Sequence, residues 1–523
     1  MFFTIDDRRS PLPGQATEFV RLSKSRFVAG VQCLRRLYLQ TYAPDSPIGV
    51  DARLQGQLDQ GQRVGELAQT VFPGGVVVAS NHLAMNSALA ETAALMDNPA
   101  VPAIFEAAFR FEGIVVRVDI LERRPGNEWR LIEVKSSTSC KDHYLYDIAI
   151  QRHVLSGCGL TVSASCLMHL NRDYVYNGVY HDAAKLFTLV DLSSEISALE
   201  GEVREMLYAQ RLTLSRDEPP EVAPGGQCVA PYRCEFFAAC NPPLPGNHIS
   251  TLPHLSAKKT GVLAGANISL IPDIPADFAL SELQRRVCVT VETGRPWFSE
   301  QLASELSILE YPLYFMDFET IFPAIPRHAG MWPYSHIPFQ WSVHRQETPD
   351  ATVEHFEFLA EDENDPRSDF FESLSRVMGR SGHIVAYNAS FEAQRLEDLA
   401  GWFPEYRVRV DEMKERVWDL LPFVRRNVYH PDFCGSFSLK SVLPALLPEL
   451  TYEGMEVGKG EEAGLAWERM LRGDISSDEK AGLKSALLAY CQEDTWALVA
   501  LLKFIRDKRS VEHTSFCAPV ERN

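Results

Sequence analysis

Two carboxylates and a lysine stand close together in the first half of the chain, at Asp119, Glu133 and Lys135. They lie in two short apolar runs, 116–121 and 129–135, separated by a Pro-Gly-Asn turn signal. Such runs predict a hairpin in which Asp119 faces Glu133 and Lys135 shares a face with Glu133, because side chains alternate along a strand. A divalent cation between the carboxylates could polarise a phosphodiester and generate hydroxide, while the ammonium neutralises the growing charge.

The second half repeats this kind of pattern. Asp317 and Glu319 end another apolar run with period-two spacing, so both project from one face of a predicted strand, where a cation is the simplest way to hold them. Glu392 begins a predicted helix after a later strand, and Tyr490 and Asp494 lie four apart on one helical face. Two metal ions about 4 Å apart need several such carboxylates. Tyr490 would orient the water, since a phenol is too weak an acid to be the main base.

Three cysteines, Cys228, Cys234 and Cys240, recur with five residues between them in a loop punctuated by Pro and Gly. Eleven cysteines in 523 residues are too sparse for a disulfide scaffold. Zinc sites more often use a Cys-x-x-Cys knuckle, whereas four thiolates, three clustered and one remote, suit a [4Fe-4S] cluster. Cys33 lies in a predicted helix over 27–38, where a packed thiol is the plain interpretation.

The elements that must position these residues alternate between strands and helices, which predicts an α/β fold. We expect helices over 52–70, 142–155 and 192–212, and strands over 162–170, 339–343, 352–358 and 383–388. The second helix places Asp147 and Gln151 four apart on one face. For Asp419 and Lys440 two interpretations stay open: contact with a metal or phosphate, or a role as a helix cap or surface charge. We expect domains at 1–245 and 309–508, a linker with connecting helices at 246–308, and a tail at 509–523.

The bulk composition is that of an ordinary globular protein, with 46% hydrophobic and 23% charged residues. A net charge of -19 argues against a protein that coats nucleic acid indiscriminately, but not against a nuclease whose metal ligands are acidic. No run approaches the ~18 apolar residues of a membrane span, and the first residues are not a signal peptide. We therefore expect a cytoplasmic protein with no membrane partner.

The first-half features resemble, in their order, the RecB-type branch of the PD-(D/E)XK nucleases. Asp119 and Glu133-Val-Lys135 match the core of that family. The resemblance implies that Gln151 is the glutamine of a Gln-x-x-x-Tyr motif, although Leu155 replaces the tyrosine. It also implies a further metal ligand on an early helix, often a histidine, for which this chain offers Glu66. CRISPR-associated and AddB-type members hold a [4Fe-4S] cluster with one cysteine before the core and three after it, which implies the set Cys33, Cys228, Cys234 and Cys240.

The second-half features resemble the RNase H-like exonucleases with four acidic residues, in their tyrosine-type subgroup. Asp317 and Glu319 match the first motif, Asp-x-Glu. Glu392 ends the second motif, Asn-x-x-Phe-Asp, with Glu in place of Asp, and Tyr490 and Asp494 match the third, Tyr-x-x-x-Asp. The resemblance implies a mixed sheet and a 3′-5′ exonuclease.

Together, the resemblances cover about residues 20–245 and 309–508. They imply a PD-(D/E)XK restriction-endonuclease-like domain plus an RNase H-like exonuclease domain, both using Mg²⁺ or Mn²⁺. The expected partner is DNA, single-stranded or at ends, in processing, repair or defence, with RNA as the alternative substrate. No P-loop is present, so unwinding would come from a helicase or another repair or defence protein. Two rival hypotheses are a nucleic-acid-binding or scaffold protein with inactive nuclease folds, which Glu392 and Leu155 favour, and a first domain that is only a scaffold with zinc at its cysteines.

Overall fold

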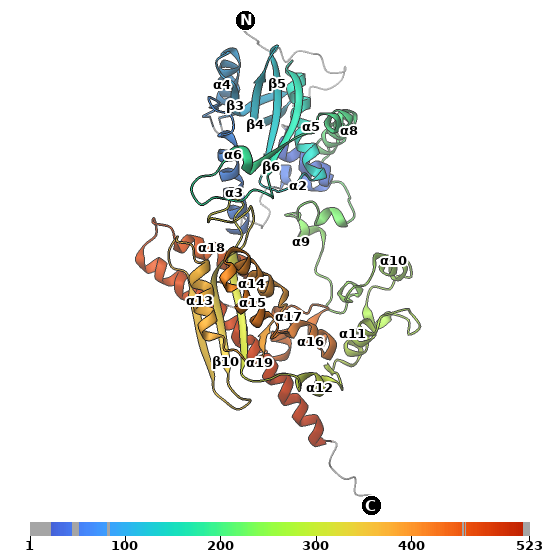
Figure 1. The fold of residues 1–523 in the computed structure, drawn as a ribbon. Coiled ribbons are helices and arrows are strands. Elements are labelled where there is room, and N and C mark those ends of the chain that lie inside the picture. The colour runs from blue at the N-terminus through green and yellow to red at the C-terminus, as the bar shows by residue number, and fades with distance from the viewer. Residues whose placement is uncertain (1–21, 44–51, 81–83, 452–453, 456, 516–523) are drawn as a thin grey trace, which may run out of the picture. The chain divides into compact units, whose positions relative to one another are not determined.

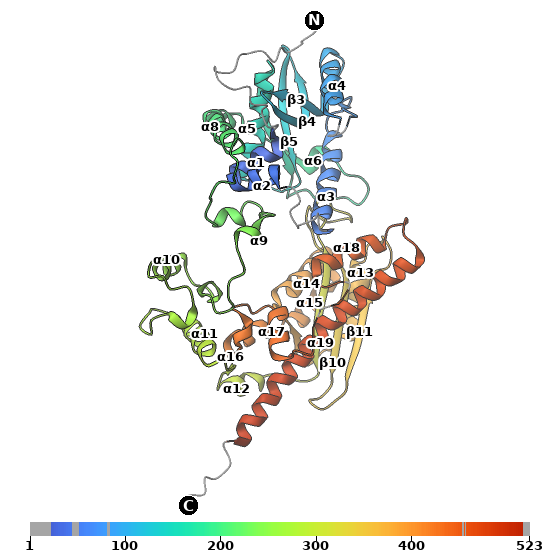
Figure 2. The same cartoon turned by 180° about the vertical axis from the view of Figure 1, so that it is seen from behind.

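The structure, a computed structural model, describes residues 22–43, 52–80, 84–451, 454–455 and 457–515. The expectations for residues 1–21 and for the end of the tail, 516–523, lie outside the described residues. The chain divides into two compact units (Figures 1 and 2). The first unit comprises residues 1–242 and 324–334, and the second comprises 243–323 and 335–523.

The first unit is built on a seven-stranded sheet with the order β2-β3-β4-β5-β6-β7, to which β1 adds beside β4. Its strands are β1 Leu22–Ser23, β2 Val76–Val77, β3 Ala103–Phe111, β4 Ile114–Arg124, β5 Glu128–Lys135, β6 Thr161–Leu170 and β7 Phe187–Asp191. β4 and β5 pair antiparallel with Ile120 opposite Ile132, so the predicted hairpin is confirmed. β5 and β6 are parallel and are joined by a helix, as parallel strands require.

The helices of the first unit pack on both faces of this sheet. They are α1 Lys24–Gln32, α2 Leu34–Tyr42, α3 Ala52–Gln69, α4 Met85–Asp97, α5 Asp142–Gly157, α6 Ala183–Leu186, α7 Ser193–Ala198, α8 Glu200–Leu214, η1 Gly226–Cys228 and α9 Phe237–Cys240. α5 packs on the face that carries Leu131, and α3 packs on the face that carries Ile132. The single helix predicted over 27–38 is wrong, because the chain is extended at Cys33 (φ −164°, ψ 123°) and separates α1 from α2. The helix predicted over 192–212 is likewise two helices, α7 and α8.

A segment from later in the sequence, 324–334, completes the first unit. The Ala324 N–H donates to Gln60 Oε1 at 3.0 Å, and the Tyr176 N–H donates to the Met331 carbonyl at 2.8 Å. The Tyr334 hydroxyl donates to the Ser136 carbonyl at 2.6 Å, directly after the end of β5. This segment therefore braces the strand that carries Lys135.

The second unit is built on a five-stranded mixed sheet with the order β11-β10-β9-β12-β13. The strands are β9 Leu313–Ile321, β10 Ile337–Gln346, β11 Val353–Leu359, β12 Ile384–Ala386 and β13 Val417–Asp419, and a separate pair joins β8 Trp297–Phe298 to β14 Val428–Tyr429. β9, β10 and β11 are antiparallel, and β10 and β11 correspond to the strands expected over 339–343 and 352–358, whereas β9, β12 and β13 are parallel. Both units are therefore α/β, as predicted.

Helices cover both faces of the second sheet, with α13 on one side (Figure 1) and the long α19 on the other (Figure 2). They are η2 Ile249–Thr251, α10 Ala257–Gly265, η3 Ile271–Asp273, α11 Glu282–Thr293, α12 Leu302–Leu306, α13 Arg367–Val377, α14 Ser390–Trp402, η4 Pro404–Tyr406, α15 Arg407–Lys414, α16 Leu420–Asn427, η5 Pro431–Phe433, α17 Leu439–Leu446, α18 Gly460–Met470 and α19 Ser477–Ser515. Residues 246–308, expected as a linker with connecting helices, bury Leu252, Val287 and Leu302 in the core of this unit.

The long helix α19 packs into the second unit. Its buried side chains, including Leu498 and Ile505, belong to the core of the second unit. Across the described ranges, no helix carries a stretch apolar enough to span a bilayer.

Candidate functional site

The first-unit carboxylates and lysine meet where β5 ends. The Val134 N–H donates to Asp119 Oδ2 at 2.7 Å, which holds Asp119 beside Glu133. Glu133 is 1% exposed, and Lys135 Nζ lies 2.8 Å from its Oε1. The same ammonium donates to Asp147 Oδ2 at 2.7 Å. The structure thus brings Asp119, Glu133 and Lys135 together and adds Asp147 from α5.

Gln151 joins this cluster from the next turn of α5. Its Nε2 donates to Glu133 Oε2 at 2.7 Å and to the Asp147 carbonyl at 2.8 Å. The side chain is fully buried, and within the described chain its Oε1 has no hydrogen-bond partner. A buried amide oxygen that accepts no hydrogen bond and lies beside two carboxylates is expected where a cation binds.

Lys24 is a member of this cluster that the sequence did not predict. Its Nζ donates to Glu133 Oε1 at 2.9 Å and to Oε2 at 3.0 Å. Lys24 is the first residue of α1, after the N-cap Ser23, whose hydroxyl accepts from the Arg26 N–H. The partner carboxylate lies 109 residues away in the sequence, and no local pattern marks such a pair.

The electrostatics of the cluster push the pKa values of the two carboxylates apart. Burial, followed by the negative charge of Glu133, raises the pKa of Asp119 from 3.8 to about 7. Burial alone would also raise the pKa of Glu133, but the ammonium groups of Lys24 and Lys135 outweigh it and lower that pKa to about 2. The positive charges of the cluster therefore stabilise the ionised form of Glu133 far more than that of Asp119.

Glu66, the expected further metal ligand, is not brought to this cluster. It lies on α3, where its Oε1 accepts from Gln62 Nε2 at 2.9 Å. The reason lies in how α3 packs, because Val64 and Ala68 face the sheet side that carries Ile132. Glu133, one residue later in β5, points to the opposite side, toward α5.

The four cysteines expected to bind a cluster converge. Cys33, Cys228, Cys234 and Cys240 all line one small cavity. The Cys234 N–H donates to the Cys228 carbonyl at 2.9 Å, and Gln32 Nε2 donates to the Gln227 carbonyl at 2.6 Å, which ties the end of α1 to the cysteine loop. The extended backbone at Cys33 is what places this residue between two helices instead of inside one.

The spacing of these sulfurs bears on the group they could hold. Within the described residues, one group of His, Cys, Asp or Glu side chains has at least three ligand atoms that all lie within 4.8 Å of one another, and its members are acidic. The four thiols do not form such a group. Four thiolates on a single zinc ion would lie about 3.8 Å apart, given a Zn–S distance of about 2.3 Å. Four cysteines and two phenylalanines in one lining, Phe236 and Phe237, are a donor set that either a zinc ion or an iron-sulfur cluster could use.

The acidic set belongs to the second unit. Asp317 and Glu319 on β9 and Asp494 on α19 offer ligand atoms that all lie within 4.8 Å of one another. Phe318, between the first two, is buried on the other side of the sheet. On the acidic side, β10 is tied to α19 because Ser342 and Thr495 share a hydrogen bond of 2.7 Å. That link holds α19 against β10 at Ser342, which pairs with Asp317 of β9.

Glu392 completes the acidic cluster from the first turn of α14. It is 4% exposed, its Oε2 has no hydrogen-bond partner within the described chain, and its charge acts on Asp317. Burial raises the pKa of Glu392 to about 7, and burial with the charge of Asp494 raises that of Glu319 to about 8. The pKa of Asp317 is also raised, by burial and then by Asp494 and Glu319. Bound cations would offset the repulsion among these crowded carboxylates and would favour their ionised forms.

Tyr490 and Lys440 lie at the edge of this cluster. The Tyr490 hydroxyl is hydrogen-bonded to Asp494, and burial, then the Asp494 charge, raises the tyrosine pKa, so it stays protonated. Lys440 Nζ lies 3.4 Å from that hydroxyl and donates to the Gly458 carbonyl at 2.5 Å. Its positive charge opposes part of the rise in the pKa of Glu319 that burial and Asp494 cause. Lys440 is therefore a cation at the acidic site.

Asp419 has a structural role at the end of β13. Its Oδ1 accepts from the Leu421 N–H at 3.0 Å and thereby caps α16. The same oxygen accepts from the Asn388 N–H at 2.9 Å, where Asn388 takes a left-handed conformation (φ 66°). Asp419 thus holds the turn that leads into α14, from which Glu392 projects.

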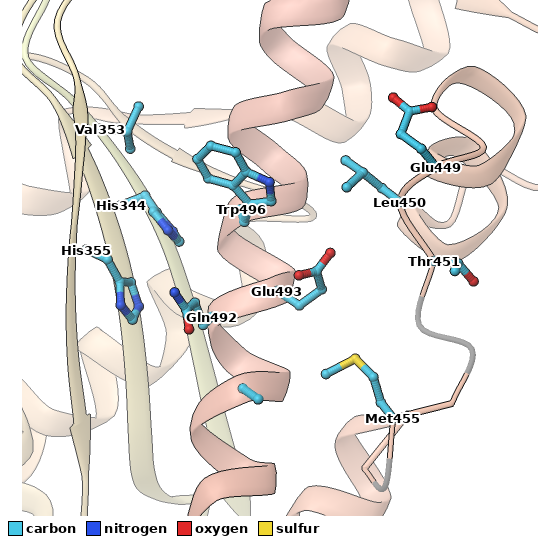
Figure 3. Close-up of a pocket in the computed structure, with 11 residues that line it drawn as sticks. His344, Val353, His355, Glu449, Leu450, Thr451, Met455, Gln492, Glu493 and Trp496 are labelled. Atoms are coloured by element: carbon cyan, nitrogen blue, oxygen red, sulfur yellow. The ribbon is translucent and has the colours of Figure 1, made fainter.

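A separate cavity of about 680 Å³ lies along α19 (Figure 3). Trp496 and Glu493 of α19 face it together with His344 and His355 of the sheet. None of the acidic ligands lines it, in the part of the chain that is described. It is therefore distinct from the acidic cluster.

Comparisons with known proteins find relatives of unknown function. A family described as "Domain of unknown function (DUF2779)" matches residues 314–438, which include Asp317, Glu319 and Glu392. "Uncharacterized protein UU173" of Ureaplasma parvum serovar 3 is 27% identical over 139 residues, 23% of this chain and 20% of the relative. "Uncharacterized protein MG366 homolog" of Mycoplasma pneumoniae is 32% identical over 139 residues, 24% of this chain and 20% of the relative. The aligned part thus spans about a fifth of each curated relative.

Among solved structures, this chain is similar to one titled "Crystal structure of SSO0001". The two share 15% identity, and the match covers 44% of this chain and 90% of the other. The TM-score is 0.24, so the likeness carries no argument about fold or function.

Proposed function

We propose that this protein is a metal-dependent nuclease with two separate active sites, acting on DNA ends or single strands. The observation that carries the proposal is the set Asp317, Glu319 and Asp494, whose ligand atoms lie within 4.8 Å of one another. Burial opposes ionisation of Asp317 and Glu319, and the charge of Lys440 offsets only part of this at Glu319. Buried acids on facing elements are costly unless a divalent ion binds them.

The residues of the second-unit site support the proposal of a 3′-5′ exonuclease. Asp317, Glu319, Glu392 and Asp494 would hold Mg²⁺ or Mn²⁺, which would activate water and stabilise the leaving oxygen. The Tyr490 hydroxyl, protonated and bonded to Asp494, is placed to orient the attacking water. A sheet of three antiparallel strands continued by two parallel ones, flanked by α13 and α19, supports an RNase H-like assignment for this unit.

The first-unit site supports a PD-(D/E)XK nuclease assignment. Asp119 and Glu133 would hold the cation, and Lys135, fixed by Asp147 at 2.7 Å, is placed to pair with phosphate charge. Gln151 positions Glu133 through the hydrogen bond of 2.7 Å. The four cysteines would hold a [4Fe-4S] cluster that joins α1 and α2 to the loop around α9.

A second candidate function is that of a nucleic-acid-binding or scaffold protein in which one fold has lost turnover. One observation favours it for the first unit, since both oxygens of Glu133 already accept hydrogen bonds from Lys24. RNA as the substrate is a further possibility that the same assay resolves.

The test is degradation of labelled single-stranded DNA and of matched RNA, with Mg²⁺, with Mn²⁺ and with a chelator. Asp317→Asn should remove end-dependent release of nucleotides, and Lys135→Met should remove a distinct remaining activity, seen on circular DNA if that site cuts internally. Asp369→Asn, a change at an acid of α13 outside both clusters, is the matched control. If the Asp317→Asn, Lys135→Met double variant degrades DNA as fast as the parent, neither assignment stands.

A further inference from the structure

Glu133 is held by two ammonium groups from distant parts of the chain. Lys24 Nζ donates to both of its oxygens, at 2.9 and 3.0 Å, and Lys135 Nζ lies 2.8 Å from Oε1. Gln151 Nε2 donates to Oε2 at 2.7 Å. The carboxylate proposed as a metal ligand is therefore fully occupied by the chain's own donors.

The backbone places Lys24 firmly in this position. β1 pairs parallel with the start of β4, with Leu22 opposite Ile114 and Ser23 opposite Val115. Leu22 is 2% exposed, and Ser23 caps α1, so the residues before and around Lys24 are fixed. Lys24 itself is only partly buried, with a side-chain exposure of 22%. A lysine that is held by ordered backbone, with part of its side chain exposed, is suited to meet a ligand.

The two lysines are not equivalent. Lys135 has a second anion, Asp147, 2.7 Å away, whereas the hydrogen bonds of Lys24 within the described chain go to Glu133 alone. A cation that binds Glu133 competes most directly with Lys24 for the oxygens of this carboxylate. Lys135 still has Asp147 as a hydrogen-bond acceptor after it loses Glu133. Lys24 then needs a new anion, and the nearest one supplied by a nucleic acid is a phosphate oxygen.

We propose that Lys24 is a second phosphate-binding ammonium of the first-unit site. In the metal-free protein it holds Glu133, and in the loaded site it releases Glu133 to the cation and pairs with the phosphate of the substrate. This assignment rests on the proposed nuclease function of the first unit. It predicts opposite effects of one substitution on metal binding and on cleavage, which a merely structural lysine would not produce.

The test uses Lys24→Met in an Asp317→Asn background, so that the first-unit site is measured without the second. Mn²⁺ binding, followed by electron paramagnetic resonance of free Mn²⁺, should become about tenfold tighter because a competing charged hydrogen bond is gone. Cleavage of labelled DNA should fall on the order of a hundredfold, as expected on loss of a group that stabilises the transition state. Lys24→Gln, which keeps a donor for Glu133, is the second variant with the same predicted directions.

Two further variants make the outcomes distinguishable. Lys185→Met removes an exposed lysine of the same unit, with 78% side-chain exposure, and should change neither property. Lys135→Met should abolish first-unit cleavage. If Lys135→Met cleaves like its parent, the nuclease assignment of this unit fails. If Lys135→Met is inactive but the Lys24 variants bind Mn²⁺ no more tightly, or cleave at the parental rate, the role of Lys24 alone is overturned.

Discussion

Replacing Glu319 with glutamine should stabilise the metal-free second unit at high pH. Glu319 is 7% exposed, and burial together with the charge of Asp494 raises its pKa from 4.5 to about 8. Because the folded pKa lies above the unfolded one, the stability linked to this group is complete below pH 4.5 and is lost as the pH rises through about 8. At pH 9 the ionised carboxylate therefore opposes folding, and glutamine, which has the same shape without the charge, removes that cost.

The size of the effect follows from the pKa displacement. A shift from 4.5 to about 8 corresponds to about 5 kcal/mol of free energy of unfolding at pH 9. For a unit of this size, that free energy raises the midpoint of thermal unfolding on the order of 10 °C. At pH 5, where the folded parent keeps Glu319 protonated, the variant and the parent should unfold at nearly the same temperature.

The assay is calorimetric unfolding of chelator-treated protein at pH 5 and pH 9. Glu363→Gln, which removes an exposed charge in a turn of the same unit, is the matched control and should leave both midpoints unchanged. Adding Mn²⁺ at pH 9 should stabilise the parent and not Glu319→Gln, because only the parent has the full ligand set. A Glu319→Gln variant that unfolds at or below the parental midpoint at pH 9, or that gains as much at pH 5, would refute this linkage.

Three further substitutions have defined outcomes. Gln151→Leu removes the donor to Glu133 Oε2 and should slow first-unit cleavage about tenfold, measured in the Asp317→Asn background; an unchanged rate would show that the glutamine does not position Glu133. Tyr490→Phe should slow nucleotide release by the second unit on the order of a hundredfold while leaving Mn²⁺ binding unchanged, and weakened Mn²⁺ binding would instead make Tyr490 part of the metal site. Anaerobically purified protein should show a broad brown absorption that Cys240→Ser loses, whereas a colourless, zinc-loaded parent would remove the iron-sulfur assignment.

The elements with strong periodicity were predictable from the sequence. The alternation in 116–121 and 129–135 predicted the β4–β5 hairpin, and the turn between them sets its register. The break at Cys33 was not predictable, because apolar residues continue at helical spacing on both sides of it. Residues 246–308 were expected as a linker with connecting helices, but the burial of Val287 in the core of the second unit was not predictable, because it depends on tertiary packing.

Some residues of the candidate sites could be predicted from local sequence patterns, whereas others depend on long-range contacts. Period-two spacing alone placed Asp317 and Glu319 on one face of a strand. Glu66 was expected at the first-unit cluster, but its helix packs on the other face of the sheet, and helix placement is a tertiary property. Lys24 and the 324–334 segment are both long-range additions, and a single sequence carries no signal for contacts of that kind.

The most direct measurement of the central claim is anomalous scattering from crystals soaked in Mn²⁺. We predict manganese peaks among Asp317, Glu319 and Asp494 and between Asp119 and Glu133. Crystals soaked at high Mn²⁺ concentration that show no manganese at either acidic cluster would contradict the claim that these carboxylates bind divalent cations.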